Sequence, residues 1–197
     1  MISKTVFGVQ VNSLEKWDRL LWNEEIQVNA LWAPKIAPGD VVIDAGCGPG
    51  GWTLVALAKG ATVYAFDPKP YCAQIISEVL AVNDFKDRCT FVQIGLKDKA
   101  GQIFFEKQWY PAISIDEYMA DKNLQRLDHI FIDVEGFDLE VIQGARETIR
   151  QFHPRVVVEV HHHLGVSWDA LEAELKSLGN YTCERHFDLM IEATYSK

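Results

Sequence analysis

A glycine-rich turn inside an α/β-type pattern is the feature that most constrains the fold of this chain. The apolar run Val41–Ala45 includes an acid, Asp44, and continues as GCGPGG before a helical pattern begins. Glycine has no side chain, so the backbone at Gly46, Gly48 and Gly50 can turn sharply and approach a ligand closely. This order of strand, turn and helix predicts a loop that holds a nucleoside-bearing ligand.

The position of the acid points to one class of ligand. Asp44 opens a DxGxGxG pattern. S-adenosylmethionine carries an ammonium and a sulfonium group near such a loop, where a carboxylate attracts them, whereas the pyrophosphate of a dinucleotide would be repelled. The pattern therefore predicts S-adenosylmethionine as the cofactor. Its predicted contacts in the loop are Asp44, Gly46, Cys47, Gly48 and Gly50.

Length, charge and cysteine usage limit the class of protein. The 197 residues suit a domain with a substantial core, and the formal net charge of −9 argues against general nucleic-acid binding. The four cysteines are scattered, without zinc-finger spacing, so we expect free thiols in a reducing cytoplasm. No signal peptide is evident, and no run approaches the roughly 20 apolar residues of a membrane span.

Strand-like and helix-like segments alternate through most of the chain. Strands are expected at 41–45, 61–67, 89–95, 129–133 and 155–161, with shorter ones at 102–106 and 112–115. Helices are expected at 51–59, 71–83, 137–150 and 167–178, and a hairpin at 181–195. Apolar strands that alternate with helices are typical of a parallel sheet covered on both faces. We therefore predict an α/β fold with a doubly wound, mostly parallel seven-stranded sheet and a C-terminal antiparallel hairpin.

Residues 1–38 are interpreted as a lead-in segment, before a cofactor-binding domain at 39–197. Apolar residues from Leu14 to Ile26 recur at roughly helical spacing, which indicates an amphipathic helix. The tryptophans of this segment fit packing against the core better than they fit a substrate pocket, because most aromatic side chains become buried.

Polar residues near the ends of the second and third strands are further candidates for cofactor binding. Ligands of doubly wound sheets bind at the carboxyl ends of the strands. Asp67 ends the second strand, where its carboxylate could accept hydrogen bonds from both ribose hydroxyls. Leu96 and Asp98 follow the third strand, where they could hold the adenine ring, although a plain polar turn fits Asp98 equally well.

The candidate catalytic residues follow the fourth and fifth strands. Asp133 and Glu135 precede Gly136, which permits an unusual turn into the next helix. These acids could orient the reacting end of the cofactor or accept a proton from a substrate hydroxyl. His161 is a candidate general base, because an imidazole titrates near pH 6.5. The alternative for His161 is a place in a loop of solvated histidines.

A metal site is the less favoured interpretation of the same region. Glu159 and His161 alternate onto one face of the fifth strand. Together with Asp133 they could bind a divalent ion if the three side chains converge. The sequence alone favours a site without metal.

The chain resembles FkbM-type S-adenosylmethionine-dependent methyltransferases over roughly residues 39–161. The resemblance is carried, in order, by GDVVIDAGCGPGGWTL (39–54), VYAFDPKP (63–70), Asn83, GLKDKAG (95–101), SIDE (114–117), IDVEGFDLEVIQGA (132–145) and HPRVVVEVH (153–161). It implies a class I methyltransferase fold, with cofactor contacts at Asp44, Gly46, Gly48 and Asp67. Two features depart from the family pattern, namely GCGPGG in place of a GAN-like turn and Asp67 in place of a glutamate.

The resemblance further implies O-methylation of a hydroxyl on a sugar, a lipid-linked glycan or a secondary metabolite. The partner would then be a small molecule or a glycan. One alternative is a nicotinamide-dependent oxidoreductase that uses the same loop, against which Asp44, the hairpin and the DVEG sequence argue. The other is a module that binds S-adenosylmethionine without catalysis.

Overall fold

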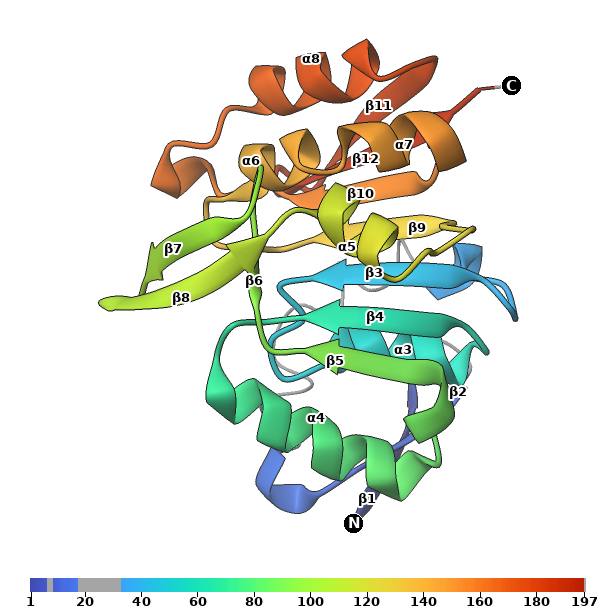
Figure 1. Cartoon of the computed structure of the whole chain (residues 1–197). Coiled ribbons are helices and arrows are strands. Elements are labelled where there is room, and N and C mark those ends of the chain that lie inside the picture. The colour runs from blue at the N-terminus through green and yellow to red at the C-terminus, as the bar shows by residue number, and fades with distance from the viewer. Residues whose placement is uncertain (7–8, 18–32, 197) are drawn as a thin grey trace. The chain divides into compact units, whose positions relative to one another are not determined.

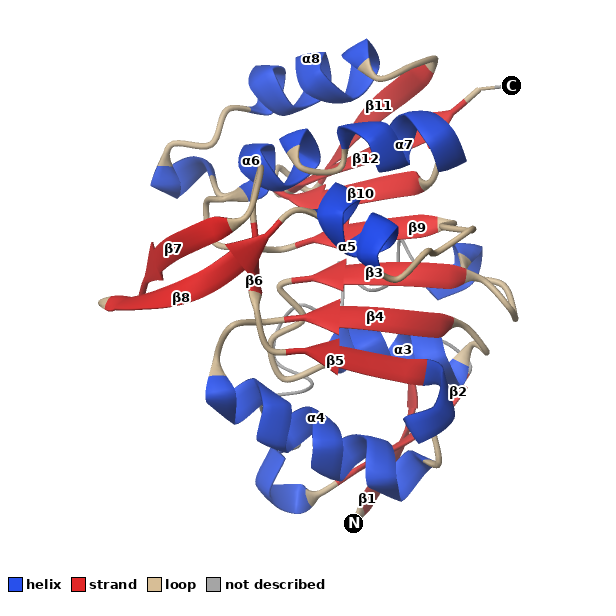
Figure 2. Cartoon of the chain, viewed as in Figure 1, coloured by secondary structure: helices blue, strands red, loops and turns tan. Residues whose placement is uncertain are grey.

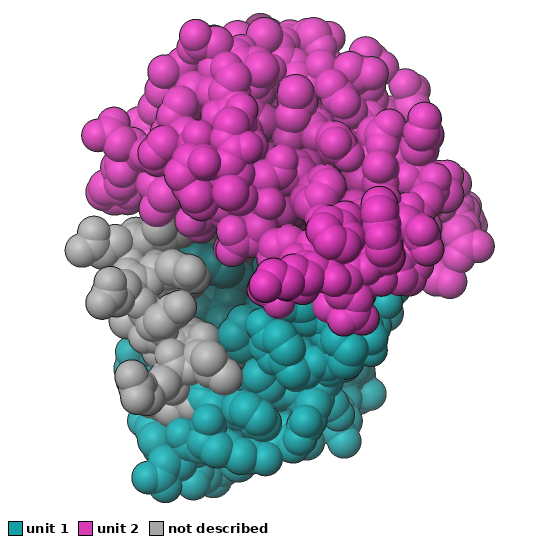
Figure 3. Space-filling model, turned by 90° about the vertical axis from the view of Figure 1, so that its left-hand side faces the viewer, with its two compact units in different colours: residues 1–93 teal, residues 94–197 magenta. Residues whose placement is uncertain are grey.

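The chain forms two compact units. The structure is a computed structural model that describes residues 1–6, 9–17 and 33–196. The units are Met1–Gln93 and Ile94–Lys197, which Figure 3 colours separately. The glycine-rich turn belongs to the first unit, and the acids and histidines after the later strands belong to the second.

The main sheet confirms the predicted fold class. The first unit contributes three parallel strands, β3 (Val41–Ala45), β4 (Thr62–Phe66) and β5 (Cys89–Val92). The second contributes β9 (His129–Ile132), β10 (Arg155–Glu159), β11 (Tyr181–His186) and β12 (Met190–Tyr195). β9 and β10 are parallel, and β12 pairs antiparallel with both β10 and β11 (Figure 2). The sheet is therefore seven-stranded and mostly parallel, with a C-terminal antiparallel hairpin.

Burial explains why the central strands are mostly apolar. Val42 and Ile43 of β3 are fully buried, and so are Ile130–Ile132 of β9. The middle of β10, Val156–Val158, is buried as well. Strands covered on both faces cannot alternate polar and apolar residues, so the polar groups of this chain gather at the strand ends.

The helices α3 (Gly51–Ala58) and α4 (Pro70–Asn83) accompany the strands of the first unit. α3 follows the glycine-rich turn, and α4 follows β4 (Figure 1). Pro70 lies in the first turn of α4, where its missing N–H costs nothing. A short 3-10 turn (Lys86–Arg88) then leads into β5.

Two short strands precede the predicted lead-in helix. β1 (Ile2–Val6) and β2 (Val9–Ser13) pair antiparallel, because this stretch alternates polar and β-branched residues in a manner typical of strands. Val11 is buried while its neighbour Gln10 is exposed. The predicted helix from Leu14 to Ile26 is helical at 15–17, and its remainder lies outside the described residues. The boundary at residue 39 stays a prediction.

The strand β2 is attached to α4 mainly through the amide side chain of Asn83. Asn83 accepts a hydrogen bond from the backbone N–H of Asn12 at 2.7 Å, and its amide nitrogen donates to the Asn12 carbonyl at 2.7 Å. Below this contact, Val11 packs in a cluster with Leu54, Ile75 and Val79. Asn83 therefore replaces the backbone partner that an edge strand lacks.

The predicted strand at 89–95 is two separate strands. After β5 the chain leaves the main sheet, and β6 (Gly95–Leu96) pairs instead with β8 (Gln108–Ile113). β8 also pairs antiparallel with β7 (Gly101–Phe105), which completes a small three-stranded sheet. Gly95 allows this change of partner, because a Cβ there would collide with Ile103 of β7.

The predicted helix at 137–150 is likewise two helices, α6 (Asp138–Gln143) and α7 (Arg146–Phe152). The break follows from contacts with α5 (Ile115–Asp121), which begins with a capping box between Ser114 and Glu117. The backbone N–H of Asp116 donates to the Gly144 carbonyl at 2.8 Å, and its carboxylate accepts from two N–H groups in the first turn of α7. A carboxylate in this position accepts hydrogen bonds from the backbone N–H groups that have no partner at the start of a helix.

The last described helix, α8 (Trp168–Ser177), is capped by the hydroxyl of Ser167. All four cysteines are free thiols, as predicted. Within the part of the chain that the structure describes, no helix combines the length and apolar character that crossing a bilayer requires.

Gly144→Ala tests the close approach at the α6–α7 break. A Cβ at this position would collide with the Lys97 carbonyl and lie 3.0 Å from the Ser114 Cβ. We expect a loss of about 1–3 kcal/mol in the free energy of unfolding, the usual cost of overpacking, measured by chemical denaturation. The control is Gly101→Ala, where a Cβ would meet nothing within 4 Å. Equal effects of the two substitutions would refute the contact.

Candidate active site

The glycine-rich turn adopts the conformations that the sequence predicts. It connects the end of β3 to the start of α3. Gly46, Gly48 and Gly50 have φ angles of +83°, +52° and +95°. Residues with side chains rarely occupy this left-handed region, so the glycines are required by the path of the backbone.

Hydrogen bonds fix the turn to the end of β4. The backbone N–H groups of Gly46 and Cys47 both donate to the Phe66 carbonyl, each at 2.9 Å. Gly50 closes the turn by donating to the Cys47 carbonyl at 2.9 Å. The turn is thus held by backbone bonds on both sides.

Asp67 connects the turn to the residues that follow β4. Its carboxylate accepts from the backbone N–H of Gly48 at 3.1 Å and from that of Lys69 at 2.8 Å. The side chain is only 4% exposed. Burial raises the pKa of Asp67 from its ordinary value, although the hydrogen bonds from Lys69 and Gly48 act in the opposite direction. Asp67 therefore supports the turn besides being a candidate ribose ligand.

Asp44 lies deeper than the rest of the turn. Its side chain is 3% exposed, and its carboxylate accepts a hydrogen bond of 2.5 Å from the hydroxyl of Thr53 in α3. Such a bond to an ionised acceptor is among the stronger ones in proteins. Thr53 thereby fixes the orientation of the acid that opens the motif. The sequence analysis did not single out this threonine, because a threonine in a helical pattern gives no sign of its partner.

The turn leaves open space on one side. Among the residues that the structure describes, a Cβ built at Gly48 would meet nothing within 4 Å, whereas one at Gly50 would lie 2.9 Å from Ile76. Gly50 therefore serves close packing against α4, and Gly48 leaves its side of the backbone uncovered. This uncovered backbone fits the approach of a ligand such as S-adenosylmethionine.

Cys47 contributes through its backbone more than through its thiol. Burial raises the pKa of this thiol well above its ordinary value, and the neighbouring carboxylates of Asp44 and Asp67 raise it further. The thiol is therefore neutral at physiological pH and is a poor nucleophile.

Leu96 and Asp98 belong to the second unit. Leu96 is buried within β6. Lys97 lies 3.5 Å from Asp98 and 3.6 Å from Glu140 of α6. This geometry fits a polar turn, and the contact of Leu96 and Asp98 with an adenine ring stays a prediction.

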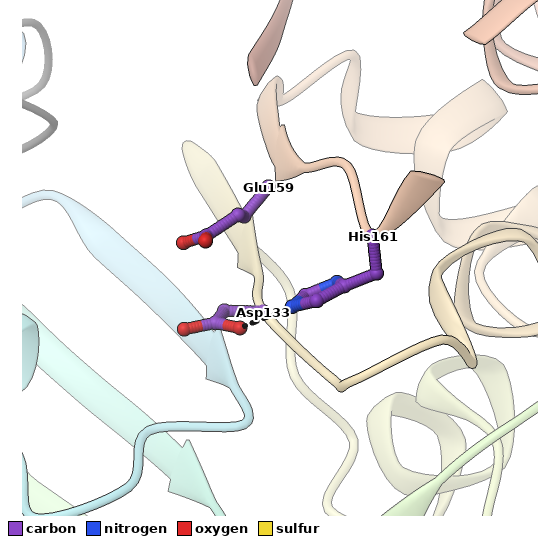
Figure 4. A group of neighbouring side chains, drawn as sticks. All are labelled: Asp133, Glu159 and His161. Atoms are coloured by element: carbon purple, nitrogen blue, oxygen red, sulfur yellow. Dashed lines mark ion pairs between the residues drawn. The ribbon is translucent and has the colours of Figure 1, made fainter. Parts of the chain in front are cut away.

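The acids and the histidine that follow β9 and β10 converge. Val158 of β10 lies opposite Ile132 of β9, so the next residues, Glu159 and Asp133, emerge side by side from neighbouring parallel strands. Figure 4 shows His161 reaching toward Asp133 beside Glu159, and one ligand atom of each residue lies within 4.8 Å of the others. The convergence that the sequence analysis left open is therefore present.

His161 lies between carboxylates. Its Nε2 is 3.3 Å from a carboxylate oxygen of Asp133 and 3.7 Å from one of Glu135. Its Nδ1 is 3.2 Å from both carboxylate oxygens of Asp138. The His161 residue is 5% exposed, so it is no solvated loop histidine.

Asp138 is the residue of this cluster that the sequence analysis missed. It is fully buried at the first position of α6. An acid at a helix start normally indicates a solvated first turn. Helical spacing was the signal that could have found it. Val141 and Ile142 lie three and four residues after Asp138 and are both buried, so Asp138 shares their buried face of the helix.

The surroundings of His161 change its protonation. Burial lowers the pKa of the imidazole, but the hydrogen bonds to Asp133 and Asp138 outweigh burial and raise the pKa from 6.5 to about 10. The imidazole is therefore a cation at neutral pH in this arrangement. A protonated imidazole cannot accept a proton, so its role as a general base is disfavoured in this state.

The turn after Asp133 has an uncommon backbone. Glu135 and Gly136 are consecutive residues with φ angles of +51° and +99°. A glutamate in the left-handed region is uncommon, and such conformations concentrate at functional sites. Gly136 also packs closely, because a Cβ there would lie 3.3 Å from Leu164.

Comparison with known proteins agrees with this architecture. A family model for the methyltransferase FkbM domain matches residues 44–182. Methyltransferase sdnD from Sordaria araneosa is 26% identical, over 70% of this chain and 72% of that protein. The relative NoeI, a 2-O-methyltransferase from Sinorhizobium fredii, is 24% identical, over 57% of this chain and 60% of that protein.

A solved structure shows the same fold. The crystal structure of a methyltransferase FkbM from Methylobacillus flagellatus superimposes with a TM-score of 0.68 at 19% identity, over 82% of this chain. The match covers 44% of that chain, so the present chain spans less than half the length of the solved one. The fold is thus of the class I methyltransferase type.

The raised pKa of His161 predicts how stability depends on pH. The unfolded chain loses the imidazole proton near pH 6.5, whereas the folded protein holds it until about pH 10. The stabilisation is therefore complete below pH 6.5 and is lost as pH rises through about 10.

The measurement is the difference in unfolding free energy between the wild type and His161→Gln, in metal-free buffer. We expect this difference to shrink by about 1–3 kcal/mol between pH 6 and pH 9. Subtracting the unfolding free energy of the variant from that of the wild type removes the contributions of thiols and tyrosines, because these groups titrate in both proteins. A difference that does not change with pH would contradict the assignment.

Proposed function

Because the chain belongs to the methyltransferase FkbM family, we propose that it transfers a methyl group from S-adenosylmethionine to a hydroxyl group of its acceptor. The observation that carries this proposal is the glycine-rich turn, which Asp67 supports and Gly48 leaves open. Within a methyltransferase family, a buried acid and an uncovered backbone at this turn favour a cationic methyl donor. The family match also favours methyl transfer over the nicotinamide-dependent alternative.

The proposed acceptor is a small molecule or a glycan. The relative NoeI is a 2-O-methyltransferase, which supports oxygen as the methylated atom. A hydroxyl on a sugar, a lipid-linked glycan or a secondary metabolite agrees with this. The net charge of −9 disfavours a polyanionic acceptor that binds by general electrostatics.

The proposed reaction requires alignment and one proton acceptor. The acceptor oxygen attacks the methyl carbon, the carbon–sulfur bond breaks with its electron pair on sulfur, and the hydroxyl proton passes to a base. Bound S-adenosylmethionine supplies the electrophilic methyl group. The protein contributes by positioning the reactants, excluding water and holding the base.

Glu135 is the best candidate for the base. His161 already holds a proton at neutral pH, and Asp133 faces the imidazole at 3.3 Å. The Glu135 side chain is about half exposed, and its left-handed backbone sets its direction. We therefore assign proton acceptance to Glu135, and the positioning of the reacting groups to Asp133 and His161.

Asp67→Asn tests the cofactor site. The change removes the charge that would bind the ribose hydroxyls and retains one acceptor oxygen for the turn. We expect S-adenosylmethionine to bind more weakly by about 1.5–3 kcal/mol, the range for a charged hydrogen-bond partner, as measured by calorimetry. Asp87→Asn is the control, since Asp87 is an exposed acid of the same unit. Unchanged affinity in Asp67→Asn would remove Asp67 from the site.

Glu135→Gln tests the base. The substitution keeps the size of the side chain and removes its ability to accept a proton. We expect turnover to fall by about 100-fold or more while cofactor affinity and unfolding free energy stay near those of the wild type. Glu147→Gln changes an exposed acid of α7 and serves as the control. If wild-type protein binds the cofactor but methylates no member of a broad hydroxylated-substrate panel, the non-catalytic alternative is favoured.

A further inference from the structure

The side chains at the ends of β9 and β10 form a set of metal-type ligands. One nitrogen of His161 and one oxygen each from Asp133 and Glu159 all lie within 4.8 Å of one another. Figure 4 shows the carboxylates of Asp133 and Glu159 side by side, with the imidazole of His161 reaching toward Asp133. We propose that these three residues bind a divalent cation of the first transition series, such as Mn²⁺ or Zn²⁺.

The distances suit a shared ion. Ligand atoms that lie about 2.1 Å from one ion are roughly 3.0–3.4 Å apart in octahedral or tetrahedral geometry. The Nε2 of His161 and the nearest oxygen of Asp133 are 3.3 Å apart. These two atoms therefore already have the separation of neighbouring ligands.

Asp138 orients the imidazole for this role. The carboxylate of Asp138 lies 3.2 Å from Nδ1, and it is fully buried at the start of α6. When the ion binds, the Nε2 proton passes to solvent, the Nδ1–H keeps its hydrogen bond to this carboxylate, and the lone pair of Nε2 faces the ion. Metal-binding histidines are commonly held by such a carboxylate on the other ring nitrogen. The buried Asp138 is thus a positioning residue rather than a ligand.

The charge balance of the cluster favours a cation. Within the described residues, the ion pairs of Asp133, Glu135 and Asp138 all go to the one imidazole of His161. Even a protonated imidazole offsets one of these three negative charges. Carboxylates close to one another repel strongly where water is partly excluded. A divalent ion would relieve this repulsion.

A second group of potential ligands in the hairpin serves as a comparison. Glu184, His186 and Glu192 also bring ligand atoms within 4.8 Å of one another. However, the carboxylate of Glu192 already pairs with the buried guanidinium of Arg155 at 2.6 Å. Arginine keeps its charge at any physiological pH and would repel a second cation. The hairpin group therefore lacks the excess negative charge of the group at β9 and β10.

The donor set indicates the kind of ion. One imidazole and two carboxylates suit Mn²⁺, Fe²⁺ or Zn²⁺ better than Ca²⁺ or Mg²⁺, which prefer oxygen ligands. Three protein ligands leave positions open for water or a hydroxyl of the acceptor. Contact with the ion would lower the pKa of that hydroxyl and ease transfer of its proton to Glu135. This last role rests on the proposed methyl transfer, whereas the ion site itself does not.

The test is a titration of the metal-free full chain with Mn²⁺, followed by electron paramagnetic resonance. Free aqueous Mn²⁺ gives a sharp spectrum that weakens when the ion binds. We expect one ion per chain, displaced by added Zn²⁺. Asp133→Asn, Glu159→Gln and His161→Gln should each abolish this binding. Asp138→Asn should weaken it by about 10–100-fold, the usual effect of losing the partner of a metal-binding histidine.

Control variants establish that Mn²⁺ binds at this cluster and not elsewhere on the chain. Glu147→Gln and His186→Gln should bind Mn²⁺ as the wild type does, and circular dichroism establishes that each variant is folded. Glu159 is partly exposed, so Glu159→Gln keeps the test valid if a variant at the buried His161 or Asp138 fails to fold. Failure of the wild type to bind Mn²⁺ or Zn²⁺, unchanged binding in Asp133→Asn, or loss of binding in His186→Gln would each overturn the proposal.

The same samples distinguish this proposal from the proposed function. Calorimetric binding of S-adenosylmethionine depends on the turn and Asp67, and it requires no ion in this scheme. Cofactor binding without Mn²⁺ binding would overturn the metal site alone. Mn²⁺ binding without cofactor binding would overturn the methyltransferase proposal and leave the metal site standing.

Discussion

Parallel pairing of buried strands determines where this chain can place polar side chains. Ile130–Ile132 of β9 and Val156–Val158 of β10 are buried, so a charged side chain at these positions would lose its water without a partner. The polar groups of these strands therefore stand at or beyond the strand ends, and the candidate site lies at the carboxyl ends. In the first unit the same rule places Asp67 directly after β4, where it accepts from the turn that follows β3. Strand register then brings together residues that are far apart in the sequence, such as Asp133 and Glu159.

The strand and helix pattern of the main sheet could be predicted from the sequence because it depends on local periodicity and on glycine. The errors have a different origin. Residues 89–95 form one apolar run, but Gly95 pairs with β8, and only tertiary contact decides that. The predicted helix at 137–150 breaks because Asp116 of α5 caps the start of a second helix, α7. Asp138 was missed because its burial results from the packing of α6, and the protonation of His161 follows from its hydrogen bonds to Asp138 and Asp133.

Charged side chains of the second unit are arranged in two different ways. Arg155 and Glu192 form a pair of one cation and one anion across β10 and β12, and their charges balance. Around His161 three carboxylates share one imidazole, and the balance is negative. Burying unbalanced charge is costly, so a fold retains it mainly where another charged group completes the site. The balanced pair of Arg155 and Glu192 is suited to stabilising the fold, whereas the unbalanced cluster around His161 is suited to chemistry.

The amide clasp between Asn83 and Asn12 has a consequence for handling the protein. One side chain satisfies both backbone groups of Asn12, and Val11 fills the apolar cluster beneath it. Removing the first thirteen residues would expose Leu54, Ile75 and Val79. It would also leave the amide of Asn83 without its two backbone hydrogen-bond partners on Asn12. Proteolysis between Ser13 and Ala33 would therefore turn a covalently tethered strand into a dissociable peptide.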